Sequence, residues 1–180
     1  MNSRKSIILV ATLILAMSTA VFAQSDPFGK TDTIYAEAYR IDDKNWAVNV
    51  SLFNDEEIMA LSIPFVFSGG MTKVVADSTV YTGGLVEAFR VKQSRVDTTT
   101  QCLTIGLISD VGVSVPPIPP GKGRIATVFV SALDGSKLET LKVDTTTTPP
   151  GNNLQLVSPP SSGIVPAFVI VKGEKAKEEK

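Results

Sequence analysis

The sequence predicts an all-β protein folded as an antiparallel β-sandwich of about nine strands. From Thr33 onward, short runs rich in β-branched and aromatic residues alternate apolar and polar side chains with a period of two. This period is typical of a strand that buries one face. Turn-forming residues separate the runs, and no stretch has the sustained 3.6-residue periodicity of an amphipathic helix.

The clearest alternation lies at 46–53, where the only tryptophan shares a face with three aliphatic side chains. Trp46 is therefore expected in the core, because a face of this kind is stabilised by burial. Cys102 lies in a strongly apolar run and is expected to be a buried, unreactive thiol. The other expected strands, marked by the same period, lie at 34–39, 59–67, 85–91, 103–107, 125–130, 141–143 and 165–171.

Two of the connections have distinctive compositions. Residues 42–45 are polar and follow the first strand, so they are expected to close a hairpin. Residues 115–120 contain four prolines, which is too many for a strand that forms a ladder. This segment is expected to be an extended, polyproline-like crossover.

The first 23 residues have the pattern of a cleavable signal peptide. Arg4 and Lys5 are followed by an apolar stretch at 7–16, and Ala23 ends an A-x-A-like cleavage site. The apolar stretch is too short to span a bilayer. The mature chain is therefore expected to begin at Gln24 and to be secreted or periplasmic, with no membrane span after signal removal.

The pattern divides the rest of the chain into three parts. Residues 24–32 are expected to form a flexible leader, residues 33–171 a single sandwich domain, and residues 172–180 a charged flexible tail. Because the sequence has one cysteine, no intramolecular disulfide is available, and stability must come from burial of the core.

The composition argues against several classes of function. The chain has 17 basic and 18 acidic residues, and 15 basic residues remain without Arg4 and Lys5. Nucleic-acid binding is therefore not expected. The absence of histidine excludes Ser-His-Asp and Cys-His catalysis. Acidic clusters at 42–43 and 55–57 lack EF-hand spacing and are interpreted as solvated turns. No enzyme activity, catalytic residue, cofactor or metal is expected.

One strand offers a candidate binding face. Its apolar residues at 34, 36 and 38 leave Tyr35, Glu37 and Tyr39 on the opposite side. The two tyrosines stand about 13 Å apart along a strand, which matches the reach of a short oligosaccharide. Cross-strand packing on a half-exposed sheet face is the commoner use of such residues, and both interpretations stay open.

The order of motifs from about Thr33 to Val171 resembles cohesin-type domains and the related β-sandwich carbohydrate-binding modules. The segments that carry the resemblance lie at 48–54, 58–67, 74–83, 102–108 and 118–130, with 74–83 interpreted as a connection that ends in a Gly turn. The resemblance implies a jelly-roll sandwich of about nine strands, a bacterial extracellular setting, and binding of a protein module or polysaccharide.

Three functions are compatible with these observations. The first is an exported, non-catalytic binding module that acts through protein–protein contact, with another exported protein as its partner. The second is a structural subunit of an extracellular layer or filament that pairs through an exposed strand edge. The third is a carbohydrate-binding module that uses Tyr35, Glu37 and Tyr39.

Overall fold

The computed structural model describes residue 26, residues 29–110 and residues 115–172. The predicted signal peptide and residues 173–180 of the predicted tail lie outside this part of the chain. The described residues form eleven strands and no α-helix. None of them belongs to a helix long and apolar enough to cross a membrane. The strands are β1 (Thr33–Arg40), β2 (Asn45–Asn54), β3 (Ala60–Ser68), β4 (Val74–Val80), β5 (Val91–Asp97), β6 (Cys102–Ile108), β7 (Gly121–Ala132), β8 (Lys142–Thr145), β9 (Gln155–Ser158), β10 (Ser162–Ile164) and β11 (Ala167–Lys172).

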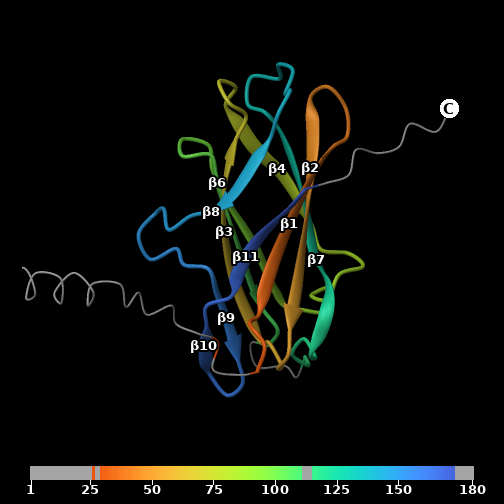
Figure 1. The fold of residues 1–180 in the computed structure, drawn as a ribbon, viewed down its shortest axis with the longest axis vertical. Coiled ribbons are helices and arrows are strands. Elements are labelled where there is room, and N and C mark those ends of the chain that lie inside the picture. The colour runs from red at the N-terminus through yellow and green to blue at the C-terminus, as the bar shows by residue number, and fades with distance from the viewer. Residues whose placement is uncertain (1–25, 27–28, 111–114, 173–180) are drawn as a thin grey trace, which may run out of the picture.

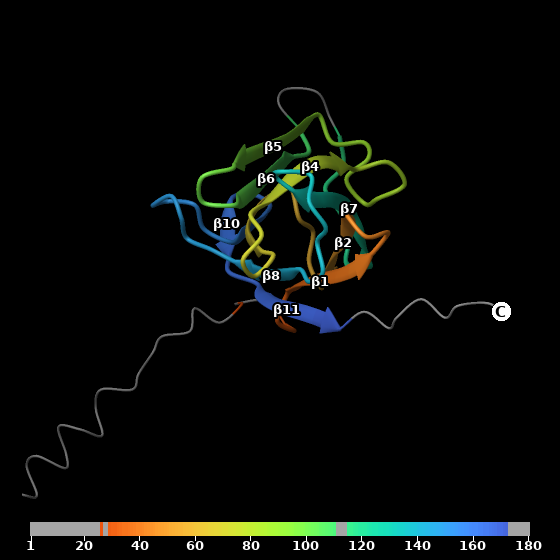
Figure 2. The same cartoon turned by 90° about the horizontal axis from the view of Figure 1, so that it is seen from above.

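These strands form two sheets that pack face to face (Figures 1 and 2). One sheet has the order β11-β1-β2-β7-β4, and the other has the order β10-β9-β3-β6-β5 with β8 also paired to β3. Every pair is antiparallel except β1 and β11, which run parallel side by side (Figure 1). The predicted β-sandwich is confirmed, with eleven strands in place of about nine and one parallel pair.

The core lies between the two sheets and follows the predicted alternation. Val48, Val50 and Leu52 of β2 are fully buried, as are Leu103 and Ile105 of β6. Aromatic side chains from the two sheets contact each other in the core. The ring of Phe65 on β3 packs edge to face against that of Phe168 on β11, with centroids 6.0 Å apart. The two sheets thus share one continuous core.

Trp46 packs against this core but is only half-buried. Its indole Nε1–H donates a hydrogen bond to the carbonyl oxygen of Leu138 at 3.0 Å. Trp46 lies near the start of β2, beside the 42–45 hairpin, where the sandwich ends. The expected packing of Trp46 is therefore present, and the side chain remains partly exposed.

The prediction of a strand at 85–91 is wrong. Residues 82–88 form successive turns, in which the N–H of Glu87 bonds to the carbonyl of Gly84 at 3.1 Å and that of Phe89 to Val86 at 3.0 Å. Val86 and Phe89 are both buried, and Leu85 is exposed. A three-residue spacing in a turn, and not the period of a strand, brings the apolar side chains inward.

The other connections behave largely as expected. The 42–45 hairpin is present, and Asp42 Oδ1 accepts the N–H of Lys44 at 2.7 Å and that of Asn45 at 2.9 Å. In the proline-rich segment only Ile118 pairs, through one isolated bridge to Ile58. The segment at 74–83, interpreted as a connection, contains strand β4.

Candidate functional site

The outer face of the β9-β3-β6-β5 sheet carries two rows of side chains in exact cross-strand register. We call this surface the hollow face. Its first row is apolar and consists of Val157, Ala60, Ile108 and Val91. Its second row is polar around a glycine and consists of Gln155, Ser62, Gly106 and Gln93.

The hollow results from the glycine in its centre. A Cβ placed on Gly106 would meet no atom within 4 Å, so the space above this residue is open. The two rows line a shallow depression of ≈ 250 Å³. The side chains of Ile105 and Leu107 point to the other face and are fully buried, which holds the strand in place beneath the depression. The floor is therefore rigid backbone, flanked by amide groups.

The loop between β8 and β9 covers the far end of the same sheet. Asn152 Nδ2 donates a hydrogen bond to Thr104 Oγ1 at 2.8 Å. Beneath this loop Cys102 is 5% exposed, and its Sγ is 3.4 Å from the carbonyl oxygen of Thr100. The prediction of a buried thiol is confirmed. Between the loop and the sheet lies a second depression of ≈ 360 Å³, which shares Gln93 and Gly106 with the hollow face.

The rim of the sheet near this loop carries a fixed negative charge. Hydrogen bonds from the Thr100 side chain and from the N–H groups of Thr99 and Thr100 hold the pKa of Asp97 below its usual value. On the other side of β5, burial raises the pKa of Tyr81, whose hydroxyl is 2.7 Å from Ser94 Oγ. Neither group is placed to exchange protons with a ligand on the hollow face.

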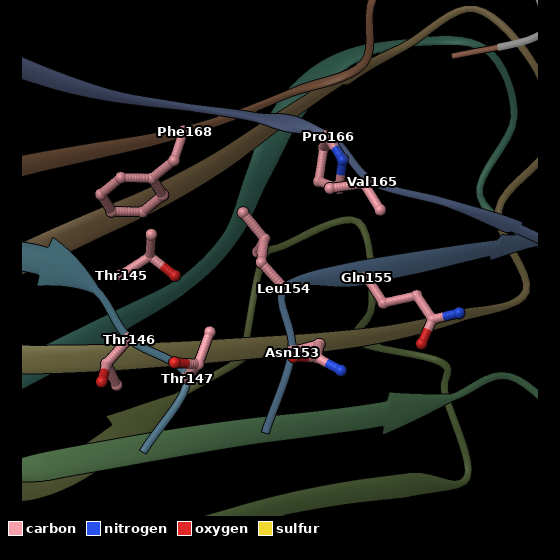
Figure 3. A pocket seen from close by; sticks show the side chains of 9 residues that line it. All are labelled: Thr145, Thr146, Thr147, Asn153, Leu154, Gln155, Val165, Pro166 and Phe168. Atoms are coloured by element: carbon pink, nitrogen blue, oxygen red, sulfur yellow. The ribbon is translucent and has the colours of Figure 1, made fainter. Parts of the chain in front are cut away.

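A larger groove of ≈ 910 Å³ opens where the two sheets separate, between β8, β9 and β11 (Figure 3). In Figure 3, Phe168 and Thr145 lie together on one side of this space, and Leu154 lies on the other. Thr145 Oγ1 donates to the carbonyl oxygen of Pro64 at 3.0 Å. The groove is lined by Thr145, Thr146, Thr147, Asn153, Leu154, Gln155, Val165, Pro166 and Phe168. None of these side chains is titratable, so the groove supplies no general acid or base.

The structure places Tyr35, Glu37 and Tyr39 on the opposite outer face of the sandwich, on β1. Tyr39 is 38% exposed and Tyr35 is half-buried. Lys122 Nζ lies 4.5 Å above the centre of the Tyr35 ring, a cation–π contact that covers one face of the ring. A carbohydrate site at these three residues stays a prediction.

Sequence reasoning did not find the hollow face. Gly106 interrupts an otherwise apolar strand, and a glycine inside a strand marks a place where another molecule can approach the backbone closely. That signal was present in the sequence. The partner residues of each row depend on strand register, which no local pattern determines between strands far apart in the chain.

Several solved cohesins have a similar structure. The third cohesin of ScaC from Acetivibrio cellulolyticus, solved in complex with the ScaB dockerin, matches with a TM-score of 0.59 and 16% identity over 77% of this chain and 93% of its own. A cohesin of OlpA from Clostridium thermocellum, in complex with a dockerin, matches with a TM-score of 0.54 and 16% identity over 79% and 100%. A non-cellulosomal cohesin from the archaeon Archaeoglobus fulgidus matches with a TM-score of 0.52 and 15% identity over 83% of this chain and 95% of its own.

No protein-family model matches the chain, and neither does any curated protein. At these low identities the structural similarity establishes the fold alone. The chain therefore has a cohesin-type fold, and the expectation drawn from the order of its sequence motifs is confirmed.

Proposed function

We propose that the chain is an exported, non-catalytic module that binds another protein through the hollow face. The observation that carries the proposal is the shallow, open depression above Gly106. It lies on a fold shared with cohesins that were solved bound to dockerins. A partner of the same general kind, a small module of another exported protein, follows from this similarity.

The shape of the hollow face favours a protein over a small molecule. Its depression of ≈ 250 Å³ is below the range of about 300–1,000 Å³ that is typical of small-molecule sites. An apolar row beside exposed amides is suited to an interface with a hydrophobic centre and a polar rim. The partner would place an apolar side chain over Gly106 and form hydrogen bonds with Gln93 and Gln155.

The composition supports a non-catalytic role. The chain has no histidine, and its single thiol is buried beneath the β8–β9 loop. A nucleophile needs a base within hydrogen-bonding reach, and the lining of the hollow face contains no carboxylate, thiol or amine.

Export rests on the signal-peptide pattern of residues 1–23. N-terminal sequencing of the protein recovered from the exported fraction should begin at Gln24. A recovered chain that still contains residues 7–16 would contradict cleavage at this site.

Binding through the hollow face is tested by filling it. Gly106→Arg adds a long side chain above an open position, so the fold should persist, while capture of a protein partner from the exported fraction should weaken about tenfold or more. Ser78→Arg, at an exposed position of β4 in the other sheet, is the matched control. Circular dichroism verifies the fold of both variants.

Three results of this experiment are informative. Loss of the partner in Gly106→Arg alone supports the proposal. Equal recovery by wild type and both variants would place the binding surface elsewhere. A wild-type chain that retains no exported protein at micromolar concentration would contradict a protein-binding role.

A second candidate is a structural subunit that assembles through a strand edge. The observation that favours it is the exposed apolar surface of β11, where Val169, Ile170 and Val171 are 40%, 53% and 37% exposed. Among the described strands, β11 ends its sheet and pairs with β1 alone. Backbone groups on its outer side are therefore available to a further strand.

A further inference from the structure

Four carboxylates that are distant in the sequence come together beside the start of β1 and the end of β2, at the lower end of the sandwich in Figure 1. We call this group the acidic cluster. It consists of Asp26, Asp32, Asp55 and Glu56. One oxygen from each of these residues lies within 4.8 Å of the corresponding oxygen of every other.

The cluster is built around a buried acid. Asp32 is 0% exposed, and its Oδ1 accepts the N–H of Asp55 at 3.3 Å. The other oxygen, Oδ2, is buried and receives no hydrogen bond. A buried carboxylate oxygen without a donor is costly, since an unpaired ionised group loses its hydration. The position of Asp32 therefore indicates a missing positive partner.

Other oxygen atoms near Asp32 are also buried without a hydrogen-bond donor. Asp55 Oδ1 and both carboxylate oxygens of Glu56 are also buried without a hydrogen-bond partner. Asn54, 1% exposed, leaves its Oδ1 without a donor, while its Nδ2 donates to the carbonyl oxygens of Glu56 and Pro119 at 2.6 and 3.0 Å. The two hydrogen bonds donated by the Asn54 amide hold the turn in place. The amide and carboxylate oxygens of this turn are left without a hydrogen-bond donor.

No basic side chain of the described residues neutralises this charge through an ion pair. The three ion pairs of residues 26, 29–110 and 115–172 involve Asp43 and Glu139, away from Asp32, Asp55 and Glu56. Without a cation, burial raises the pKa of Glu56 to about 8 and that of Asp32 to about 6. A proton shared with Asp55 and Asp32, and repulsion from the neighbouring carboxylates, raise the pKa of Glu56 further. At Asp32 the contact with Glu56 lowers the pKa and partly offsets the effects of burial and repulsion.

The backbone is shaped around the same carboxylates. Lys30 donates its N–H to Asp55 Oδ2 at 2.5 Å. Gly29 adopts a φ of 61°, and a Cβ there would collide with the Asp55 carboxylate. Only glycine lets the segment before β1 approach this closely. The carbonyl of Asp32 in turn accepts the N–H of Ala167 at the start of β11, at 2.8 Å.

We propose that the acidic cluster is a calcium site, which fastens the segment before β1 to the end of β2. Calcium binds six to eight oxygens at about 2.3–2.6 Å, so two oxygens on one ion lie within about 5 Å of each other. The 4.8 Å limit of the cluster meets this condition. Zinc prefers nitrogen and sulfur ligands, which the cluster lacks, and magnesium seldom accepts several direct carboxylates.

The sequence pattern predicts a solvated turn at 55–57, and the structure differs. Glu57 is exposed, whereas Asp55 and Glu56 are half-buried against the segment before β1. The cluster does not follow EF-hand spacing, because its ligands come from two segments, and Asp55 lies 23 positions after Asp32.

The experiment uses the metal-depleted chain with Asp26 retained and calcium alone as the probe. Isothermal titration should show one bound calcium, and calcium at a hundredfold excess over Kd should raise Tm by about 5–10 °C. Glu56→Gln should lower the calcium affinity about tenfold or more, since affinity depends on ligand charge. The same variant should unfold at an equal or higher Tm than wild type without metal, because a neutral amide avoids the cost of burying and protonating the Glu56 carboxylate.

Asp43→Asn is the matched control, because Asp43 is an exposed acid in a turn outside the cluster. It should keep the full calcium response. If Glu56→Gln fails to fold, Asp55→Asn provides the same test. Absence of heat and of a Tm shift in wild type at about 10 mM calcium, beyond the usual range of extracellular sites, would overturn the proposal. A calcium response unchanged in the cluster variants, or a stronger response to magnesium, would also overturn it.

Discussion

At the scale of single residues, two glycines illustrate how the surroundings set the cost of a side chain. A Cβ on Gly84 would lie 2.7 Å from the carbonyl oxygen of Ile125 and 2.9 Å from that of Arg124. Both neighbours are backbone atoms of β7, which cannot move without disturbing the sheet. Gly106, in contrast, faces open space on the hollow face. One glycine is required by packing, and the other leaves room for a partner.

This contrast predicts opposite effects of the same substitution. Gly84→Ala should lower the free energy of unfolding by about 1–3 kcal/mol, as overpacking does. Gly106→Ala should leave it unchanged or raise it by up to about 1 kcal/mol, because glycine is unfavourable inside a strand. Urea unfolding followed by Trp46 fluorescence measures both. Equal losses in the two variants would show that crowding at Gly84 is not what requires glycine there.

At the scale of elements, alternation predicted the strands that bury one full face. The runs that became β2, β3 and β6 each place every second residue in the core, so local sequence and final structure agree. Trp46 followed the same rule and packs against the core. In these three strands a period of two over seven or more residues agrees with the tertiary packing.

The elements that were missed are short or lie at edges. β9 has four residues and β10 has three, too few for a period to be visible. β4, an edge strand, buries only Val74 and Ala76, so its second half resembles a polar connection. At 85–91 the apolar spacing matched a strand by chance, while the Gly84 turn determined the actual path.

Both candidate sites depend on contacts between distant segments. The hollow face joins residues of four strands through their register, and only Gly106 gave a local signal. The acidic cluster joins Asp32, before β1, to Asp55, after the neighbouring strand β2. Local sequence shows which residues are acidic, and it does not show which of them the fold removes from water.

At the scale of the whole molecule, five strands of the described residues pair along one edge only: β11, β4, β10, β5 and the four-residue β8. Such edges pair with other chains unless they are short, charged or covered. β10 has only three residues. β5 carries Lys92 and Arg95 in exposed positions, and β4 carries the exposed Asp77.

β11 has none of these protections over Val169 to Val171, which present three consecutive exposed apolar side chains. Its parallel partner β1 occupies one side, and the opposite backbone edge ends the sheet. The fold therefore concentrates its tendency to associate in one strand, on the side of the molecule away from β4 and β5 (Figure 2).

Assembly through β11 predicts concentration-dependent association of the purified chain. Sedimentation velocity from about 1 to 200 µM should show a shift from monomer to larger species, in the affinity range of a single strand pairing. Ile170→Lys should keep the chain monomeric, because a charge on an edge strand opposes pairing. Val80→Lys, at a 40% exposed position of the edge strand β4, is the matched control and should associate as wild type does. A wild-type chain that remains monomeric throughout this range would exclude the structural-subunit candidate and leave binding through the hollow face as the function to test.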